Sequence, residues 1–206
     1  DIFEKVAKQV DPGLAARWIR RELARVLNYQ KKQFGDVEIT EKHLIDLLKL
    51  VQSRKITDNV ASKILEKLIE KGHKFKSDTD TEVIAHLIEV FYNGDVEEAT
   101  KLALKEIDGS YALGIISSKE PNKLIAARNE SPLIVGVSNS SMFIASDVPA
   151  ILDYTNKVIY LDDKEIAVLA KDNFKITDLN NNTKNKEVNT IDWTKEAAQK
   201  SGYRHF

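Results

Sequence analysis

Four arginines recur at helical spacing near the start of the chain, in the segment DPGLAARWIRRELARVLNYQKK. Residues three or four positions apart share a face of a helix, so Arg17, Arg20, Arg21 and Arg25 are expected to form one basic stripe. Such a stripe can contact the phosphates of a polyanion. A solvated outer face explains it equally well, because no interleaved aromatic residues or groove-entering element accompany it.

A second residue of chemical interest is Asp80, in the segment TDTEV. Thr79 and Glu82 have the spacing of a capping box, which predicts a helix with Asp80 in its first turn. The helix dipole favours a carboxylate there by about 0.3–1 kcal/mol, so a structural role alone explains this residue.

The 206 residues contain no cysteine, which excludes a thiol nucleophile, a disulfide or a thiolate metal site within this sequence. We expect no cofactor and no metal site.

The elements around the arginines read as a small helical bundle. Apolar residues at three- and four-residue spacing predict a short opening helix over 2–10 and longer helices that begin near Asp11, Thr40 and Thr57. Asp11 is a typical N-cap, and Pro12 suits the first helical position, where no backbone N–H is needed. Four such helices predict an antiparallel bundle.

From Lys76 the pattern changes. A helix that Gly94 ends and a second helix over 96–107 precede a series of short β-rich runs separated by turn sequences. These runs are 111–117, 124–127, 133–137, 142–145, 158–161 and 166–169. Two helices followed by such a meander predict an α+β layered domain.

The charge differs between the two parts of the chain. Residues 1–72 hold 15 Lys and Arg against 11 Asp and Glu, a net charge of +4, whereas residues 73–206 have a net charge of −5. A basic first part favours a polyanionic partner.

The longest apolar runs, such as 132–137, are far shorter than the roughly 20 residues that span a bilayer, so we expect no membrane segment and a cytoplasmic location.

The motifs DPGLAARW, RELARVLN and KITDNVASKILEKL carry a resemblance over residues 1–72. This part resembles the helical domain near the C-terminus of the B subunit of the tRNA-dependent Asp/Glu amidotransferase. The resemblance implies a bundle that contacts tRNA, with Arg17, Arg20, Arg21 and Arg25 as candidate contacts. It implies no catalytic residue.

The runs GHKFKSDTDTEVIAHLIE, EIDGSYALGIIS, LIAARNESPLIVGV, FIASDVPAILDYT, VIYLDDKEIAVL and GYRHF carry another resemblance over residues 73–206. They resemble the glutaminase domain of glutamine–fructose-6-phosphate aminotransferase, which supplies ammonia for glucosamine 6-phosphate synthesis. The resemblance implies an N-terminal-nucleophile (αββα) fold, here incomplete. It also implies that Asp80 binds the α-ammonium group of glutamine. The family's nucleophilic cysteine, oxyanion hole and isomerase domain have no counterpart in this sequence.

Two functions from different classes follow. The first is a fragment or fusion derived from the aminotransferase, inactive alone, with glutamine as a vestigial ligand. The second is a tRNA-contacting module fused to a degenerate domain. The two resemblances meet near residues 68–74, so the chain is either a chimera of two gene fragments or an evolved two-domain protein, with domains 1–72 and 73–206. Strands missing from the glutaminase part would leave sheet edges uncovered, and we expect self-association there.

Overall fold

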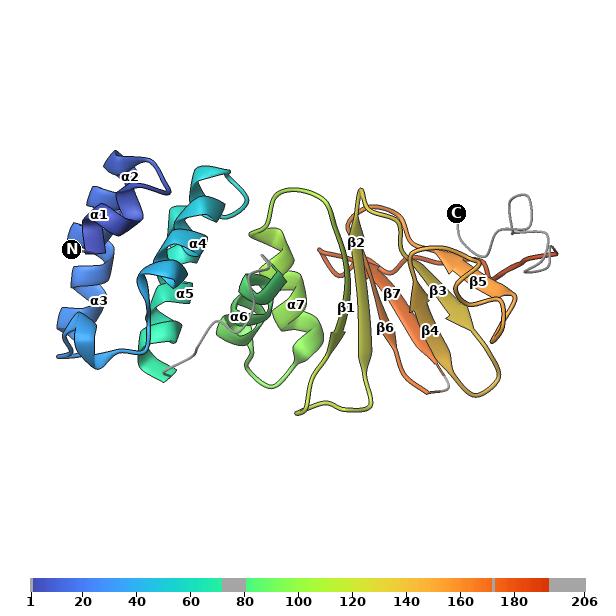
Figure 1. The fold of residues 1–206 in the computed structure, drawn as a ribbon. Helices are drawn as coiled ribbons and strands as arrows, with labels where there is room; N and C mark the ends of the chain where they lie inside the picture. Colours follow the sequence, from blue (N-terminus) through green and yellow to red (C-terminus); the bar gives the residue numbers. More distant parts are fainter. Residues whose placement is uncertain (1, 72–80, 172, 193–206) are drawn as a thin grey trace. The chain divides into compact units, whose positions relative to one another are not determined.

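The computed structural model describes residues 2–71, 81–171 and 173–192. They group into two compact units, Asp1–Asp108 and Gly109–Phe206. The described part of the first unit is mainly helical, and that of the second is built from β-strands (Figure 1). The boundary at residues 72/73 that the two resemblances suggest therefore lies inside the first compact unit.

The first unit follows the helical periodicity of the sequence. Its elements are α1 (Ile2–Ala7), α2 (Pro12–Arg17), the π-helix η1 (Trp18–Leu23), α3 (Ala24–Tyr29), the 3₁₀ turn η2 (Phe34–Asp36), α4 (Glu41–Gln52), α5 (Asp58–Lys71), α6 (Thr81–Phe91) and α7 (Val96–Lys105). The helices α2, η1 and α3 follow one another without a break. Residues 2–71 thus contain the predicted bundle of four helical stretches.

Polar side chains fix where these helices begin. The carboxylate of Asp11 accepts a hydrogen bond from the backbone N–H of Leu14 at 2.7 Å, and Pro12 occupies the first turn, as the sequence predicts. Thr40 begins α4 with a capping box in which Nδ1 of His43 accepts from the backbone N–H of Thr40 at 3.2 Å. Asp95 caps α7 through the N–H groups of Glu97 and Glu98.

A short backbone pairing joins α7 to the bundle. Ile56, just before α5, forms an antiparallel bridge with Ile107, just after α7. The N–H of Asp108 donates to the carbonyl of Lys55 at 3.1 Å. These contacts explain why α6 and α7 group with the first unit although the glutaminase resemblance includes them.

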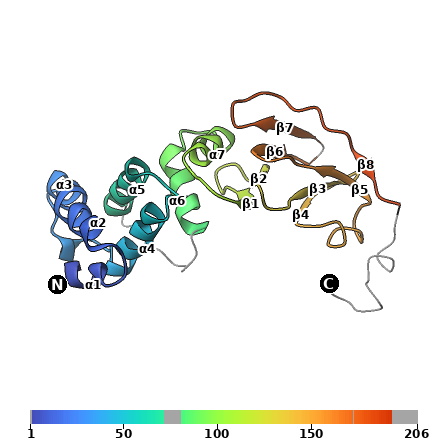
Figure 2. The same ribbon diagram turned by 90° about the horizontal axis from the view of Figure 1, so that it is seen from above.

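The second unit consists of two four-stranded antiparallel sheets (Figures 1 and 2). One has the order β1-β2-β6-β7 and the other β4-β3-β5-β8. The strands are β1 (Tyr111–Ile116), β2 (Leu124–Asn129), β3 (Ile134–Val137), β4 (Met142–Ala145), β5 (Lys157–Tyr160), β6 (Glu165–Leu169), β7 (Phe174–Asp178) and β8 (Asn189–Thr190).

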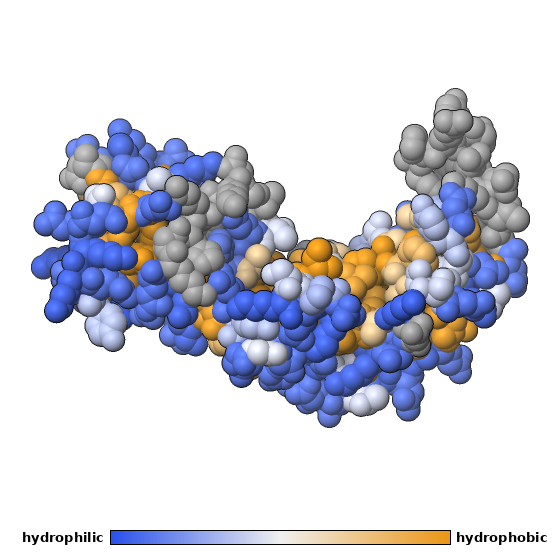
Figure 3. Space-filling view, turned by 90° about the horizontal axis from the view of Figure 1, so that it is seen from below, coloured by the Kyte–Doolittle hydropathy of each residue, from blue (hydrophilic) through white to orange (hydrophobic). Residues whose placement is uncertain are grey.

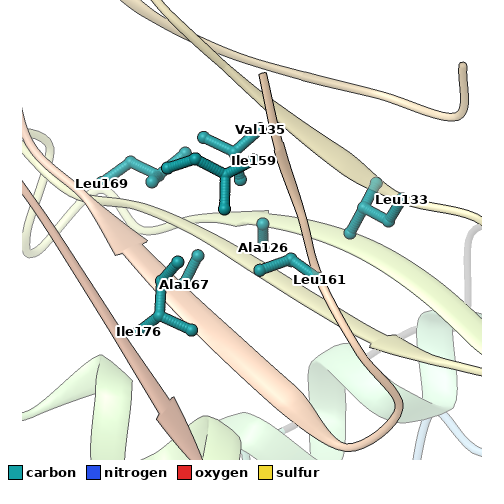
Figure 4. Packing of buried hydrophobic residues seen from close by; sticks show 8 residues of the cluster. All are labelled: Ala126, Leu133, Val135, Ile159, Leu161, Ala167, Leu169 and Ile176. Carbon is teal, nitrogen blue, oxygen red and sulfur yellow. The ribbon is translucent and has the colours of Figure 1, made fainter. Parts of the chain in front are cut away.

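The two sheets pack face to face through an apolar core. Ala126, Ala167 and Ile176 from the first sheet meet Val135 and Ile159 from the second (Figure 4). These five side chains are at most 2 % exposed. The outer face of the second sheet has its own cluster, in which the segment 147–154 covers the sheet with Val148 and Ile151.

The predicted fold class is confirmed as an α+β chain with a helical bundle followed by a sheet domain. The six predicted strands are present with ends that differ by at most two residues, while β7 and β8 were not predicted. The π-helical geometry of η1 was not predicted either. No helix among the described residues has the length and apolar character needed to cross a membrane.

Candidate functional site

The arginine stripe lies against helix α5. The guanidinium Nη2 of Arg17 is 3.1 Å from each carboxylate oxygen of Asp58, the first residue of α5. The indole N–H of Trp18 donates to Oδ1 of the same carboxylate at 2.6 Å. Because Trp18 is only 2 % exposed, Asp58 fixes a buried aromatic ring as well as a surface arginine.

Arg25 has three partners two turns further along. Its Nη2 donates to Oε1 of Glu66 at 2.7 Å, to Oγ of Ser62 at 2.8 Å and to Oε2 of Glu22 at 3.1 Å. The hydrogen bond that Arg25 donates to Glu66, followed by the one it donates to Glu22, raises the pKa of Arg25 above its ordinary value. The Ser62 hydroxyl donates to Glu22 and is the main cause that lowers the pKa of the Glu22 carboxyl, ahead of Arg25.

The two helices pair with a constant offset. Arg17–Asp58 and Arg25–Glu66 are both 41 residues apart. The same offset places Arg21 opposite Ser62, whose hydroxyl donates to Glu22 instead. Within the described residues, neither Arg20 nor Arg21 forms an ion pair or a side-chain hydrogen bond. The stripe therefore divides into two arginines bound to α5 and two that remain available.

A groove of about 410 Å³ runs between these elements. Its lining comes from the stripe and from the first turns of α5: Arg17, Trp18, Arg21, Glu22, Arg25, Asp58, Asn59 and Ser62. Arg20 lies outside this lining. The groove thus brings together three of the four predicted arginines, and Arg21 is the one whose positive charge is not already matched by a carboxylate.

The π-helix η1 carries both available arginines. A π-helical segment inside a longer helix is uncommon and is frequently found at functional sites. Here it spans Trp18–Leu23, and Trp18, Arg21 and Glu22 of this segment are among the residues that line the groove. The sequence WIRREL contains neither Gly nor Pro, so its residues do not predict a π-helix.

The acceptors on α5 were missed by sequence reasoning, although the sequence holds a signal for them. Asp58, Ser62 and Glu66 repeat every four residues, as Arg17, Arg21 and Arg25 do. Two polar stripes of equal spacing on two neighbouring helices predict a ladder of pairs.

Asp80 lies outside the described residues, as do Thr79 and the terminal GYRHF. The contact between Asp80 and glutamine that the resemblance implies therefore stays a prediction. Six residues beyond Asp80, Nε2 of His86 is 3.7 Å from Oε1 of Glu82, one turn earlier on α6. The His86 side chain is 13 % exposed, which suits a packed residue.

The charged groups of the second unit mainly fix loops. Lys186 pairs with Glu165 at 2.9 Å and also with Asp162. Arg128 donates to the carbonyl of Leu161 at 2.6 Å and to Asp163 at 2.9 Å, which fastens the turn between β5 and β6. Across the described residues, no group of three or more His, Asp or Glu is arranged to hold a metal ion.

Residues 50–153, just over half of the chain, match the model of the glutamine amidotransferase domain. The chain belongs to the glutamine amidotransferase family. Residues 1–82 match the model of the GatB domain, which bears out the first resemblance as well. The two matches overlap over 50–82, so α5 is covered by both models.

Curated relatives of the amidotransferase part are glutamine–fructose-6-phosphate aminotransferases (isomerizing). That of Methanothermobacter thermautotrophicus is 51 % identical over 145 residues, which is 69 % of this chain and 24 % of the relative. That of Thermococcus kodakarensis is 51 % identical over 154 residues, 73 % of this chain and 25 % of the relative. The chain thus spans about a quarter of the length of the relatives it matches.

Among solved structures, the glutamine phosphoribosylpyrophosphate amidotransferase of B. subtilis, complexed with ADP and GMP, has a TM-score of 0.46 and 25 % sequence identity. The match covers 58 % of this chain and 26 % of that one. The family assignment rests on the sequence matches instead.

Proposed function

We propose that this amidotransferase-family chain carries part of a glutaminase that serves aminosugar synthesis, and that it does not hydrolyse glutamine alone. The identity of 51 % to glutamine–fructose-6-phosphate aminotransferases supports the first part of this proposal. The observation that carries the second part is the absence of cysteine from all 206 residues.

Chemistry connects these two observations. Hydrolysis of an amide through a covalent intermediate needs an activated nucleophile, and the resemblance implies a cysteine thiol with its own α-amine as base. It also needs hydrogen-bond donors for the oxyanion of the tetrahedral intermediate. The resemblance places both in a part of the family domain that this sequence does not match. In the proposed function, a second polypeptide supplies them.

Asp80 is the residue of this chain that we assign to glutamine. A carboxylate pairs well with the α-ammonium group of an amino acid. One carboxylate does not make a complete amino-acid site, so we expect weak binding of glutamine by this chain alone.

Complementation tests this proposal. The full chain is mixed with a polypeptide that covers the cysteine-bearing N-terminal part of the Methanothermobacter relative, and release of glutamate from glutamine is measured. We expect no release from either component and release from the mixture. The Asp80→Asn chain should lower that activity, whereas Asp192→Asn, a substitution at an exposed acid, should not.

Two results would contradict the proposal. Glutamate release by the chain alone would show that it needs no thiol from elsewhere. A folded mixture without any gain would show that the two parts do not form one site. An added polypeptide with its cysteine replaced by alanine controls for contaminating glutaminase.

A second candidate function, contact with tRNA, is supported by the available Arg20 and Arg21. The resemblance of residues 1–72 to a tRNA-contacting bundle gives the class of partner. Because Arg17 and Arg25 are already paired with carboxylates, we assign the phosphate contacts mainly to Arg20 and Arg21. Each lost phosphate contact should reduce the slope of log affinity against log salt concentration by about one.

Matched pairs of substitutions test this candidate. Binding of unfractionated tRNA is measured over a series of salt concentrations for the full chain, for Arg20→Gln/Arg21→Gln and for Arg17→Gln/Arg25→Gln. We expect the first pair to weaken binding and flatten the salt dependence more than the second. Equal effects would contradict the assignment, and salt-independent binding would exclude phosphate contacts. A cytoplasmic location remains part of both proposals.

A further inference from the structure

The last residue of helix α3, Tyr29, has the highest exposed fraction of the aromatic side chains among the described residues. It is 83 % exposed, whereas Trp18, the aromatic residue within the arginine stripe, is 2 % exposed and belongs to the core. Across the part of the chain that the structure describes, Tyr29 forms no side-chain hydrogen bond and no ring contact. A single exposed tyrosine is ordinary on a protein surface, so its surroundings decide whether it has a function.

The residues that follow Tyr29 fasten the end of α3 to α5. Nε2 of Gln30 donates to Oε1 of Glu70 at 3.3 Å, and Nζ of Lys32 donates to the carbonyl of Ile69 at 3.1 Å. The backbone that carries the Tyr29 ring is therefore held in place. A tyrosine side chain also has few torsions, so a flat ligand that stacks on this ring costs little conformational entropy.

Cations precede and follow Tyr29 along the chain. Arg25 is four residues earlier on α3 and therefore shares a helix face with Tyr29. Arg21, the available arginine of the groove, is eight residues before Tyr29, which corresponds to about 12 Å along a helix. Lys31 is exposed, and within the described residues its side chain forms no ion pair or hydrogen bond. An exposed ring thus lies between two available positive charges in the chain.

This combination suits unpaired nucleotides. Cationic side chains contact phosphates, and an exposed aromatic ring offers a platform on which a base can stack. In a duplex the faces of the bases are stacked on one another, so a protein ring reaches them only in loops, bulges and single strands. The surface of the helical bundle that Figure 3 draws is mostly hydrophilic, which suits a charged partner better than an apolar one.

We propose that Tyr29 stacks on an unpaired base of RNA while Arg21 and Lys31 contact neighbouring phosphates. This inference rests on the tRNA contact proposed above and adds which part of an RNA the first unit takes, namely a loop or another single-stranded segment. Every base has a π face, so stacking on Tyr29 gives a preference for unpaired nucleotides and little preference for sequence.

Binding of a short RNA strand without self-complementarity, alone and annealed to its complement, tests this proposal in the full chain. Tyr29→Leu removes the ring and keeps an apolar side chain. We expect it to weaken binding of the single strand about fivefold or more, the effect of losing one stacked base, and to spare binding of the duplex. Tyr29→Phe keeps the ring and should restore the affinity. Tyr160→Leu is the matched control, because Tyr160 is 46 % exposed and lies on β5 of the second unit.

Far-UV circular dichroism shows whether each variant remains folded, as expected for substitutions at exposed positions. Single-strand binding that Tyr29→Leu leaves intact, or that Tyr160→Leu weakens equally, overturns the stacking role. An equal loss on single strand and duplex overturns it as well, because stacking acts on unpaired bases alone. In these cases salt-sensitive binding of tRNA still supports the phosphate contacts. A chain that binds neither tRNA nor either form of the RNA refutes the tRNA contact itself, and the stacking role with it.

Discussion

Arg17 and Trp18 share one acceptor, the carboxylate of Asp58, which lies 3.1 Å from the guanidinium and 2.6 Å from the indole nitrogen. The two donors come from consecutive residues where α2 passes into the π-helix, and the acceptor begins α5. Asp58 therefore holds the two helices at a fixed register. Arg17, predicted as a contact for tRNA, is used within the fold.

Asp58→Ala should destabilise the first unit. It leaves the buried indole N–H of Trp18 without its acceptor, at a cost of about 1–3 kcal/mol. Arg17→Gln is the comparison, because it removes only the exposed half of the arrangement and should cost about 0–1 kcal/mol. Urea unfolding followed by helical circular dichroism measures both. Equal losses would show that the ion pair, rather than the indole, carries the effect.

The buried ion pair between Lys101 and Glu97 should contribute strongly to the stability of the first unit. The lysine side chain is 1 % exposed and pairs with Glu97 one turn earlier on α7, itself 15 % exposed. Lys101→Met leaves a mostly buried carboxylate without this partner and should cost about 3–5 kcal/mol. The double variant Lys101→Met/Glu97→Leu should recover much of this loss, because apolar side chains need no charge partner. Thermal unfolding of both variants gives the comparison, and a double variant no more stable than the single one would contradict it.

Gly136→Ala should destabilise the second unit because the added methyl group has no space. A Cβ atom there would lie 2.8 Å from Cδ1 of Ile151, 3.0 Å from Cγ2 of Thr155 and 3.3 Å from Cβ of Phe143. Overpacking of this kind costs about 1–3 kcal/mol. Gly114→Ala should cost less, because it meets only the end of the Ile144 side chain, which can move. Denaturant unfolding ranks the two, and the reverse order would contradict the packing described for β3.

Acid should weaken the loop that follows β7. The side-chain amide of Asn182, helped by backbone N–H groups, lowers the pKa of Asp178 to about 2 from an ordinary value of 3.8. Because the folded-state pKa is the lower one, this stabilisation is present above pH 3.8 and is lost as the pH falls toward about 2. Asp178→Asn should therefore be less stable than the wild type near neutral pH. The two curves of stability against pH should converge below about pH 2; parallel curves would show that Asp178 does not titrate as described.

Local patterns account for most of the elements. The caps at Asp11 and Thr40 and the strand 142–145 follow from turn chemistry and periodicity, because these signals act within a few residues. Strand β7 was missed although Phe174 and Ile176 alternate with Lys175 and Thr177, which is the pattern of a strand. Strand β8 has only two residues, too few for a period to appear.

The sequence by itself determined the family, the absence of a thiol nucleophile and the placement of four arginines on one helix face. Motifs, composition and helical spacing give these three results without knowledge of the tertiary structure. Which arginines are available was decided by the tertiary structure. Asp58 and Glu66 come about 40 residues later, and only the packing of α5 brings them to Arg17 and Arg25. Which side chains of β1 are buried was likewise decided by the fold. Alternation shows that Ile116 and Ala112 share a face, but only the width of the opposing sheet determines whether that face is buried.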